Sequence, residues 1–115
     1  MSESILENIK KLLGIATTYT VFDQDLLIHI NSVFMILRQL GVGPKEGYKI
    51  TGPLNVWSEF SSDDRFIESV KTYVYLKVRL YFDPPQNSSL MQAIQSQINE
   101  LEWRLNVAST EDRVE

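Results

Sequence analysis

The sequence contains no cysteine and only one histidine, and these absences exclude several kinds of site. Without thiols there is no disulfide, no thiolate metal centre and no cysteine nucleophile. His29 has no second histidine in the chain and no carboxylate three or four residues further on, so we interpret it as a partly buried structural side chain. We therefore expect no metal site.

The chain also lacks an excess of positive charge and a long apolar run. Its formal net charge of -4 argues against a dedicated nucleic-acid binder, which is usually basic. No stretch approaches the roughly 18 apolar residues of a membrane span. At 115 residues, with 43% hydrophobic and 23% charged residues, the chain has the length and composition of one folded domain. We expect it to work in a reducing cytoplasm or in an assembly built there, with no membrane contact.

No catalytic fingerprint is present either. The sequence has no G-x-S-x-G motif, no P-loop and no dinucleotide-binding glycine pattern. Adjacent or nearby carboxylates occur at Asp63 and Asp64 and at Glu100 and Glu102, and helix capping and solvation explain them. We expect no enzyme, no catalytic residue and no cofactor.

The segment 70–89, VKTYVYLKVRLYFDPPQNSS, is the most apolar part of the chain. Its alternation of aromatic and aliphatic residues suits a strand, but its length and the serines at 61 and 62 favour a helix over residues 63–82. Pro84 cannot continue that helix. Apolar residues cover more than one of its faces, so we predict a central helix.

Three further helices are predicted around it. The first has Ser4 as N-cap with Glu7 in a capping box, and Gly14 ends it. The second has Asp23 as N-cap, and the last is capped by Asn87 or Ser88. Two apolar stripes mark the buried faces of the second and last helices: Leu26, Ile30, Val33, Leu37 and Leu40, then Leu90, Ile94, Ile98, Leu101 and Leu105.

Residues 43–60 contain three glycines and two prolines and separate the second and third helices. The runs 48–51 and 54–57 could form two short strands, so we predict a short β-hairpin or an irregular loop. Trp57 and Phe60 suit anchors in the core, and we also keep Trp57 as a candidate interface residue.

Four side chains lie away from the buried stripes. With about 100° per residue, Ile28 and Met35 fall nearly opposite the stripe of the second helix. This second face indicates either a helix enclosed within the monomer or a subunit interface. Trp103 lies about 170° from the stripe of the last helix, with Val107 beside it. Trp103 could lie flat on the surface, but we favour docking into another chain, because tryptophan is enriched at interface hot spots.

These patterns together predict a mainly α fold, a small bundle of about four helices. We expect one helical domain over residues 1–108 and a flexible C-terminal tail over residues 109–115, because the tail is small and charged.

A DNA-binding protein is the alternative. Lys71, Lys77 and Arg79 are mixed with Tyr73 and Tyr75 on the third helix, but they do not line one narrow stripe. No glycine turn of a helix-turn-helix joins the second and third helices.

Several segments resemble a known family. They are KKLLGI at the end of the first helix, LRQLGVGP at the end of the second, LNVWSEF, VKTYVYLKVRLYFDPP and QINELEWRLN. Together they are similar to the small head–tail connector proteins (adaptor or head-completion proteins) of long-tailed double-stranded DNA phages and prophages. YLKVRLYFDPP and ELEWRLN are the most specific segments, and the resemblance covers residues 5 to about 108.

The resemblance implies a structural virion protein at the phage neck, assembled in the bacterial host cytoplasm. About a dozen copies would form a ring that binds the portal protein and the next neck or tail-completion protein. DNA would pass through the ring without specific binding. A ring needs two different patches on each subunit, and Ile28 with Met35 and Trp103 with Val107 are the candidates. The alternative is a small helical DNA-binding or DNA-packaging-associated phage protein.

Overall fold

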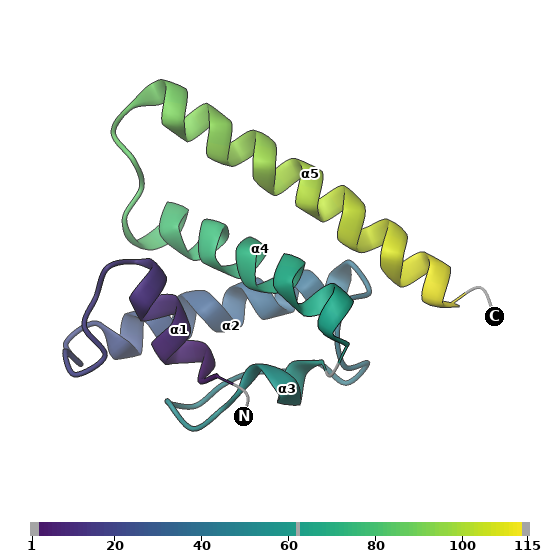
Figure 1. The fold of residues 1–115 in the computed structure, drawn as a ribbon, viewed down its shortest axis with the longest axis horizontal. Helices are drawn as coiled ribbons and strands as arrows, with labels where there is room; N and C mark the ends of the chain where they lie inside the picture. Colours follow the sequence, from purple (N-terminus) through teal and green to yellow (C-terminus); the bar gives the residue numbers. More distant parts are fainter. Residues whose placement is uncertain (1–2, 62, 114–115) are drawn as a thin grey trace.

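The computed structural model describes residues 3–61 and 63–113, and the side chains of these residues apart from 64, 65 and 110–113. The chain is mainly helical, as predicted (Figure 1). Its helices are α1 (Ile5–Leu12), α2 (Asp23–Gln39), the short α3 (Trp57–Phe60), α4 (Asp64–Phe82) and α5 (Ser88–Arg113). Within the described ranges the only β pairing is one isolated antiparallel bridge between Ser4 and Val56. The prediction of a helical bundle is therefore confirmed, and the connection between α2 and α4 is an irregular loop that contains α3.

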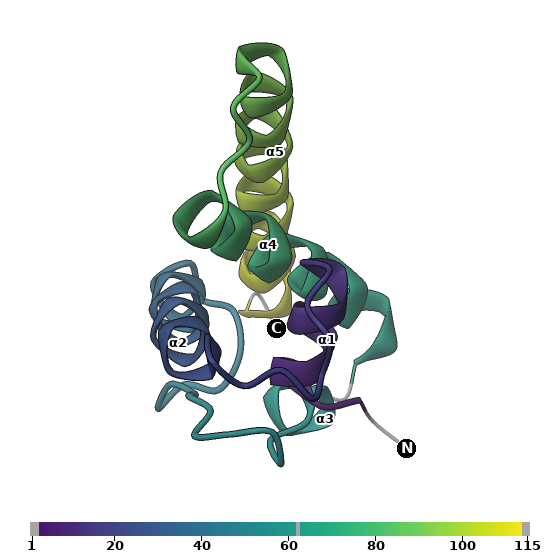
Figure 2. The same ribbon diagram turned by 90° about the vertical axis from the view of Figure 1, so that its left-hand side faces the viewer.

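Helix α4 occupies the middle of the molecule, between α2 and α5 (Figures 1 and 2). Its residues Val70, Tyr73, Val74 and Val78 are fully buried, and they face more than one neighbouring helix, as predicted for a central helix. Helix α1 packs on α2. One continuous core joins these helices with the loop, and the core includes Leu6, Ile30, Phe34, Leu37, Ile50, Trp57, Ile94 and Leu105.

The start of α1 shows the N-cap half of the predicted capping box. The backbone N–H of Glu7 donates to Ser4 Oγ at 3.2 Å, which satisfies one of the free amides at the helix N-terminus. The helix ends just before Gly14, whose φ of 81° lies in the left-handed region that glycine adopts without strain.

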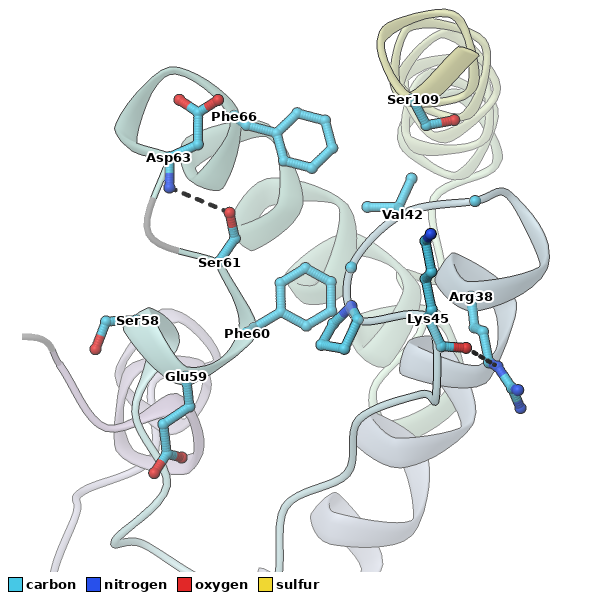
Figure 3. Close-up of a pocket in the computed structure, with 13 residues that line it drawn as sticks. Arg38, Val42, Lys45, Ser58, Glu59, Phe60, Ser61, Asp63, Phe66 and Ser109 are labelled. Carbon is cyan, nitrogen blue, oxygen red and sulfur yellow. Dashed lines mark hydrogen bonds between the residues drawn. The ribbon is translucent and has the colours of Figure 1, made fainter. Parts of the chain in front are cut away.

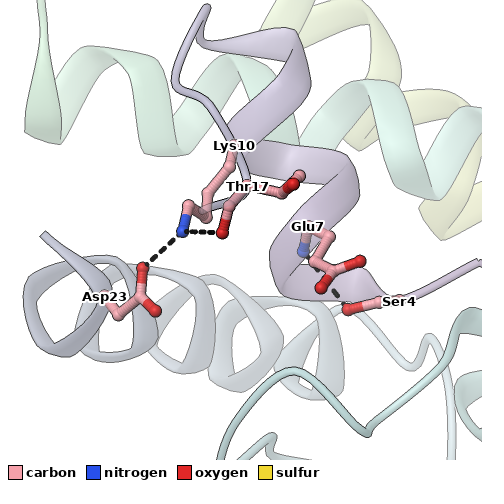
Figure 4. Close-up of polar contacts among 5 residues, drawn as sticks. All are labelled: Ser4, Glu7, Lys10, Thr17 and Asp23. Atoms are coloured by element: carbon pink, nitrogen blue, oxygen red, sulfur yellow. Dashed lines mark hydrogen bonds and ion pairs between the residues drawn. The ribbon is translucent and has the colours of Figure 1, made fainter. Parts of the chain in front are cut away.

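The start of α2 differs from the prediction. Phe22 is the N-cap and makes no side-chain capping bond, whereas Asp23 is the first helical residue. The Asp23 carboxylate instead accepts a 2.8 Å hydrogen bond from Lys10 Nζ, which also donates to the Thr17 carbonyl at 3.1 Å (Figure 4). Lys10 is only 1% exposed, so its buried ammonium needs these hydrogen-bond partners. The Asp23 carboxylate therefore pairs with Lys10 instead of capping the N-terminus of α2.

The loop 43–60 is held by side chains rather than by a strand ladder. The Asn31 amide on α2 exchanges two hydrogen bonds with the backbone of Ile50, at 2.8 and 2.9 Å. At the far end of the loop, Trp57 Nε1 donates to Asn8 Oδ1 on α1 at 3.0 Å. The bonds from Asn31 satisfy the backbone N–H and carbonyl of Ile50, which a hairpin would have paired, and no ladder forms between the two predicted short strands within the described residues.

The two long helices begin close to the predicted positions. Ser61 Oγ accepts from the backbone N–H of Asp63 at 3.2 Å just before α4, while the alternative cap at residue 62 lies outside the described residues. Asn87 Oδ1 accepts from the backbone N–H of Leu90 at 3.0 Å, which identifies Asn87 as the cap of α5.

Helix α5 continues past the predicted domain boundary. It runs to Arg113, and Ser109 is buried with its hydroxyl 3.0 Å from the Leu40 carbonyl. The first residues assigned to a tail are thus helical. The division into a domain over residues 1–108 and a flexible tail over residues 109–115 stays a prediction.

Candidate subunit interface

The outer face of α2 carries two large apolar side chains in solvent. Ile28 is 62% exposed and Met35 is 64% exposed, whereas Leu26, Ile30 and Val33 are fully buried on the opposite side of the helix. Seven residues, about 10 Å along the helix axis, separate Ile28 from Met35. In the monomer, therefore, α2 is not enclosed on this side. The interpretation of a helix sandwiched inside the monomer is excluded for this face.

The outer face of α5 carries Trp103, which is 68% exposed, with the partly buried Val107 one turn further on. On the inner face of the helix, Ile94, Ile98 and Leu105 are buried against the core. Glu102, the residue before Trp103, accepts a 2.7 Å hydrogen bond from the Tyr73 hydroxyl on α4. This contact and the buried apolar face of α5 together hold the rotation of the helix that directs Trp103 outward.

These two outer faces belong to different helices. Each lies opposite the apolar stripe through which its helix packs. Helix α4 packs between the two helices, which meet where Ser109 near the end of α5 contacts the Leu40 carbonyl at the end of α2 (Figure 2). The interface residues predicted on α2 and on α5 are therefore not brought together within one monomer. They form two separate patches, which we call the α2 face (Ile28 and Met35) and the α5 face (Trp103 and Val107).

Beside Met35 lies an open groove of about 390 Å³, between α2 and the loop 43–60. We call it the α2 groove. Phe34, Met35 and Tyr48 form its apolar lining, and the rings of Phe34 and Tyr48 meet edge to face with centroids 5.3 Å apart. The charged side chains of Arg38, Glu46 and Lys49 also line it. Sequence analysis missed this groove, because no pattern in the loop predicts how it folds against α2.

A larger open pocket, of about 890 Å³, lies at the other end of the loop (Figure 3). Phe60 and Phe66 point into it from the two sides of α4's start, while Arg38 donates from Nε to the Lys45 carbonyl at 3.2 Å. Gly43 is required here, because a Cβ at this position would lie 2.6 Å from the Phe60 ring. Charges of both signs line the pocket, including Lys45 and Glu59, so it does not concentrate one charge as an anion or cation site would.

Trp57 is not part of either patch. Its side chain is 1% exposed, and its ring packs against Phe34 with centroids 6.3 Å apart. A side chain that is enclosed by its own monomer cannot anchor a partner without local unfolding. The structure thus supports the core role for Trp57 and argues against keeping it among the candidate interface residues.

Glu59 organises the surface of the loop around itself. Its carboxylate accepts hydrogen bonds from the Tyr48 hydroxyl at 2.8 Å, the Val56 backbone N–H at 3.1 Å and the Asn55 amide at 3.3 Å. These donors favour the charged form and lower the pKa of Glu59. Burial, followed by the bond to Glu59, raises the pKa of Tyr48 well above its usual value. The pair is structural: one group stays ionised and the other stays neutral near neutral pH.

A third apolar area lies where the loop between α1 and α2 meets the end of α4. Phe22 contacts Tyr19 and Phe82 edge to face, with ring centroids 5.7 and 5.1 Å apart. Tyr81, also partly exposed, packs beside His29 at 5.6 Å. His29 is therefore a partly buried aromatic contact, as expected. The sequence signal for this area is the apolar and aromatic content of the loop 13–22, LGIATTYTVF.

Neither a metal-binding cluster nor a membrane-spanning helix occurs among the described residues. No group of three or more histidine, cysteine or acidic side chains lies close enough together to hold a metal ion. None of the helices, over the part of the chain that is described, combines the length and apolar character needed to cross a membrane.

Comparison with known proteins identifies the family. The profile of the phage connector protein family matches residues 5–112, nearly the whole chain. No curated protein and no solved structure matches the chain. The family is one of structural proteins of the phage virion, which agrees with two exposed apolar faces and with a surface pocket that lacks a concentrated charge. On the match over residues 5–112, this chain belongs to the phage connector protein family.

Proposed function

We propose that this protein forms a ring at the phage neck that joins the portal vertex of the head to the tail or to the next neck protein. About a dozen copies would surround the DNA and extend the channel. The ring would assemble in the cytoplasm of the bacterial host. The observation that carries this proposal is the family match over residues 5–112 in a chain with exposed apolar side chains on two different helices.

Two different patches on one subunit favour a head-to-tail arrangement. A patch that pairs with its own copy closes a dimer, whereas two different patches that pair head to tail continue until a ring or a filament results. The α2 face and the α5 face are two such patches. In this proposal Ile28 and Met35 of one subunit approach Trp103 and Val107 of the next.

The charge of the chain fits passage of DNA rather than its retention. Tight binding of a duplex requires lysines and arginines that neutralise phosphates, and the net charge here is -4. We therefore propose that DNA passes through the ring without specific binding. No contact in the described residues favours the alternative, a small DNA-binding or packaging-associated protein.

Native mass spectrometry of the pure protein, alone and mixed with the portal protein of the same phage, tests the proposal. We expect a complex in which many copies of this chain sit on one portal. Free protein that is monomeric does not contradict the proposal, because a ring can close on its partner. A chain that stays monomeric with the portal and retards duplex DNA in a gel would contradict it.

A further inference from the structure

We propose that Trp103 of one subunit inserts into the α2 groove of the next copy of this chain. The inference rests on the proposed ring and goes further, because it assigns an anchor residue, a receptor and the direction of the contact. The occupant of the groove is thus a second copy of this protein.

The chemistry of the groove suits a tryptophan. Its accessible apolar lining is the Tyr48 ring and the flexible thioether of Met35, with the buried Phe34 ring forming the floor, and these groups favour contact with a large aromatic side chain. Arg38 lies on the same lining, and a guanidinium binds the face of tryptophan more strongly than that of the other aromatic side chains. Its volume of about 390 Å³ lies within the range of pockets that enclose small molecules and is ample for one indole.

The groove is preformed rather than created by binding. Asn31 ties the loop to α2 through its two hydrogen bonds with Ile50, and Arg38 Nε holds the Lys45 carbonyl at 3.2 Å. Gly47 leaves room for the Arg38 side chain, because a Cβ at position 47 would approach Arg38 Cδ to 3.3 Å. A receptor with fixed walls loses little conformational entropy on binding.

Charges around the anchor and the receptor are complementary. Trp103 is flanked on the α5 face by Glu100 and Arg104, an exposed ion pair with 3.1 Å between Oε1 and Nη2. The groove presents two cations, Arg38 and Lys49, and one anion, Glu46. Both members of the α5 pair can therefore meet a residue of opposite charge when Trp103 enters. Pairing the α5 face with itself would instead leave the groove empty.

The sequence allows a test in which only one contact can form. A Met35→Glu chain keeps Trp103 but has a charge in its groove, and a Trp103→Ala chain keeps the groove but lacks the anchor. Both positions are more than 60% exposed, so neither change should disturb the monomer. A mixture of the two can form a 1:1 pair and nothing larger.

The experiment is an NMR titration of ¹⁵N-labelled Met35→Glu with unlabelled Trp103→Ala, up to about 1 mM, the range of weak contacts. The labelled chain has two indole N–H signals. We expect the Trp103 signal to shift and saturate, while the signal of Trp57, buried in the core, stays in place. The matched control uses unlabelled chain with both substitutions, and there we expect association at least about 30-fold weaker, as for loss of a hot spot.

A Trp103 signal that does not move, or that moves equally with the doubly substituted chain, overturns the assignment. Leu54→Glu, at an 89% exposed position of the loop outside the groove, should leave the titration unchanged when placed in the unlabelled chain. If it abolishes the shift, the groove is not the receptor. If rings form on the portal but the Trp103 signal does not shift, Trp103 does not insert into the α2 groove, and the proposed function still stands. The portal experiment alone tests the proposed function.

Discussion

The hydroxyl of Tyr73 on α4 donates a 2.7 Å hydrogen bond to the carboxylate of Glu102 on α5. Tyr73 is fully buried, and burial followed by the bond to Glu102 raises the pKa of its hydroxyl, which stays protonated as a donor. Because Trp103 is the next residue, this bond helps the buried face of α5 to keep the exposed indole directed outward.

We predict that Tyr73→Phe lowers the free energy of unfolding modestly. It should also weaken assembly, because α5 then holds Trp103 less firmly. Loss of a hydrogen bond to a charged group costs about 1–2 kcal/mol when the carboxylate, here only partly buried, regains water. Urea unfolding measures that loss. Glu102→Gln, which keeps an acceptor, is the matched control and should cost less. Equal stability of the Phe variant and the unchanged protein would show that the bond does not hold α5.

The buried ion pair between Lys10 and Asp23 predicts that substituting Asp23 lowers the free energy of unfolding more than substituting Lys10 does. Asp23→Ala leaves an ammonium that is 1% exposed with only the Thr17 carbonyl, and we expect a loss of about 3 kcal/mol in the free energy of unfolding. Lys10→Met removes the charge and keeps the apolar stem, while the partly exposed Asp23 regains water, so the loss should be much smaller.

Chemical denaturation of the two variants gives the order directly. The double variant, with both substitutions, should resemble Lys10→Met rather than the sum of the two. A larger loss for Lys10→Met than for Asp23→Ala would contradict this account of the start of α2.

The lowered pKa of Glu59 predicts that the stability of the fold depends on pH. Its pKa in the folded protein is lowered from 4.5, so the folded state favours the carboxylate. This contribution to stability is fully present above pH 4.5 and is lost as the pH falls through the lower, folded pKa. Glu59→Gln should therefore lose less stability than the unchanged protein as the pH falls below 4.5.

The comparison is made by denaturation at several pH values in that range. All other carboxylates are common to both proteins, so the difference between the two slopes reports Glu59. Parallel slopes would mean that Tyr48, Asn55 and Val56 do not favour its charged form.

The two tryptophans predict opposite outcomes in the same assay. Trp57→Ala empties a core site and removes the bond to Asn8, and we expect a loss of about 3–5 kcal/mol. Trp103→Ala removes an exposed ring, and the change should stay within about 0.5 kcal/mol. Thermal or urea unfolding of the pair checks both values. If Trp103→Ala unfolds the monomer, the outward direction of this face is wrong.

Local signals in the sequence predicted much of this fold. Ser4 and Asn87 cap helices where a side-chain oxygen can reach an amide three residues ahead, and a short pattern is sufficient to find such contacts. The outward positions of Ile28, Met35 and Trp103 also followed from helical spacing alone.

Contacts between distant segments could not be predicted in this way. Asp23 matched a helix cap by pattern, but its partner is Lys10, thirteen residues earlier, and only the fold brings them together. The backbone of Ile50 suited a strand, yet it pairs with Asn31 across nineteen residues. The α2 groove arises from this second contact, so it became visible only in the structure.

The central claim is that this connector assembles through the exposed ring of Trp103 while its fold does not need that ring. The most direct test is native mass spectrometry of portal complexes formed by the unchanged protein and by Trp103→Ala, with both monomers shown to be folded. We predict portals carrying many copies of the unchanged chain and few or none of the variant. Equal occupancy of the portal by the two proteins would contradict the claim.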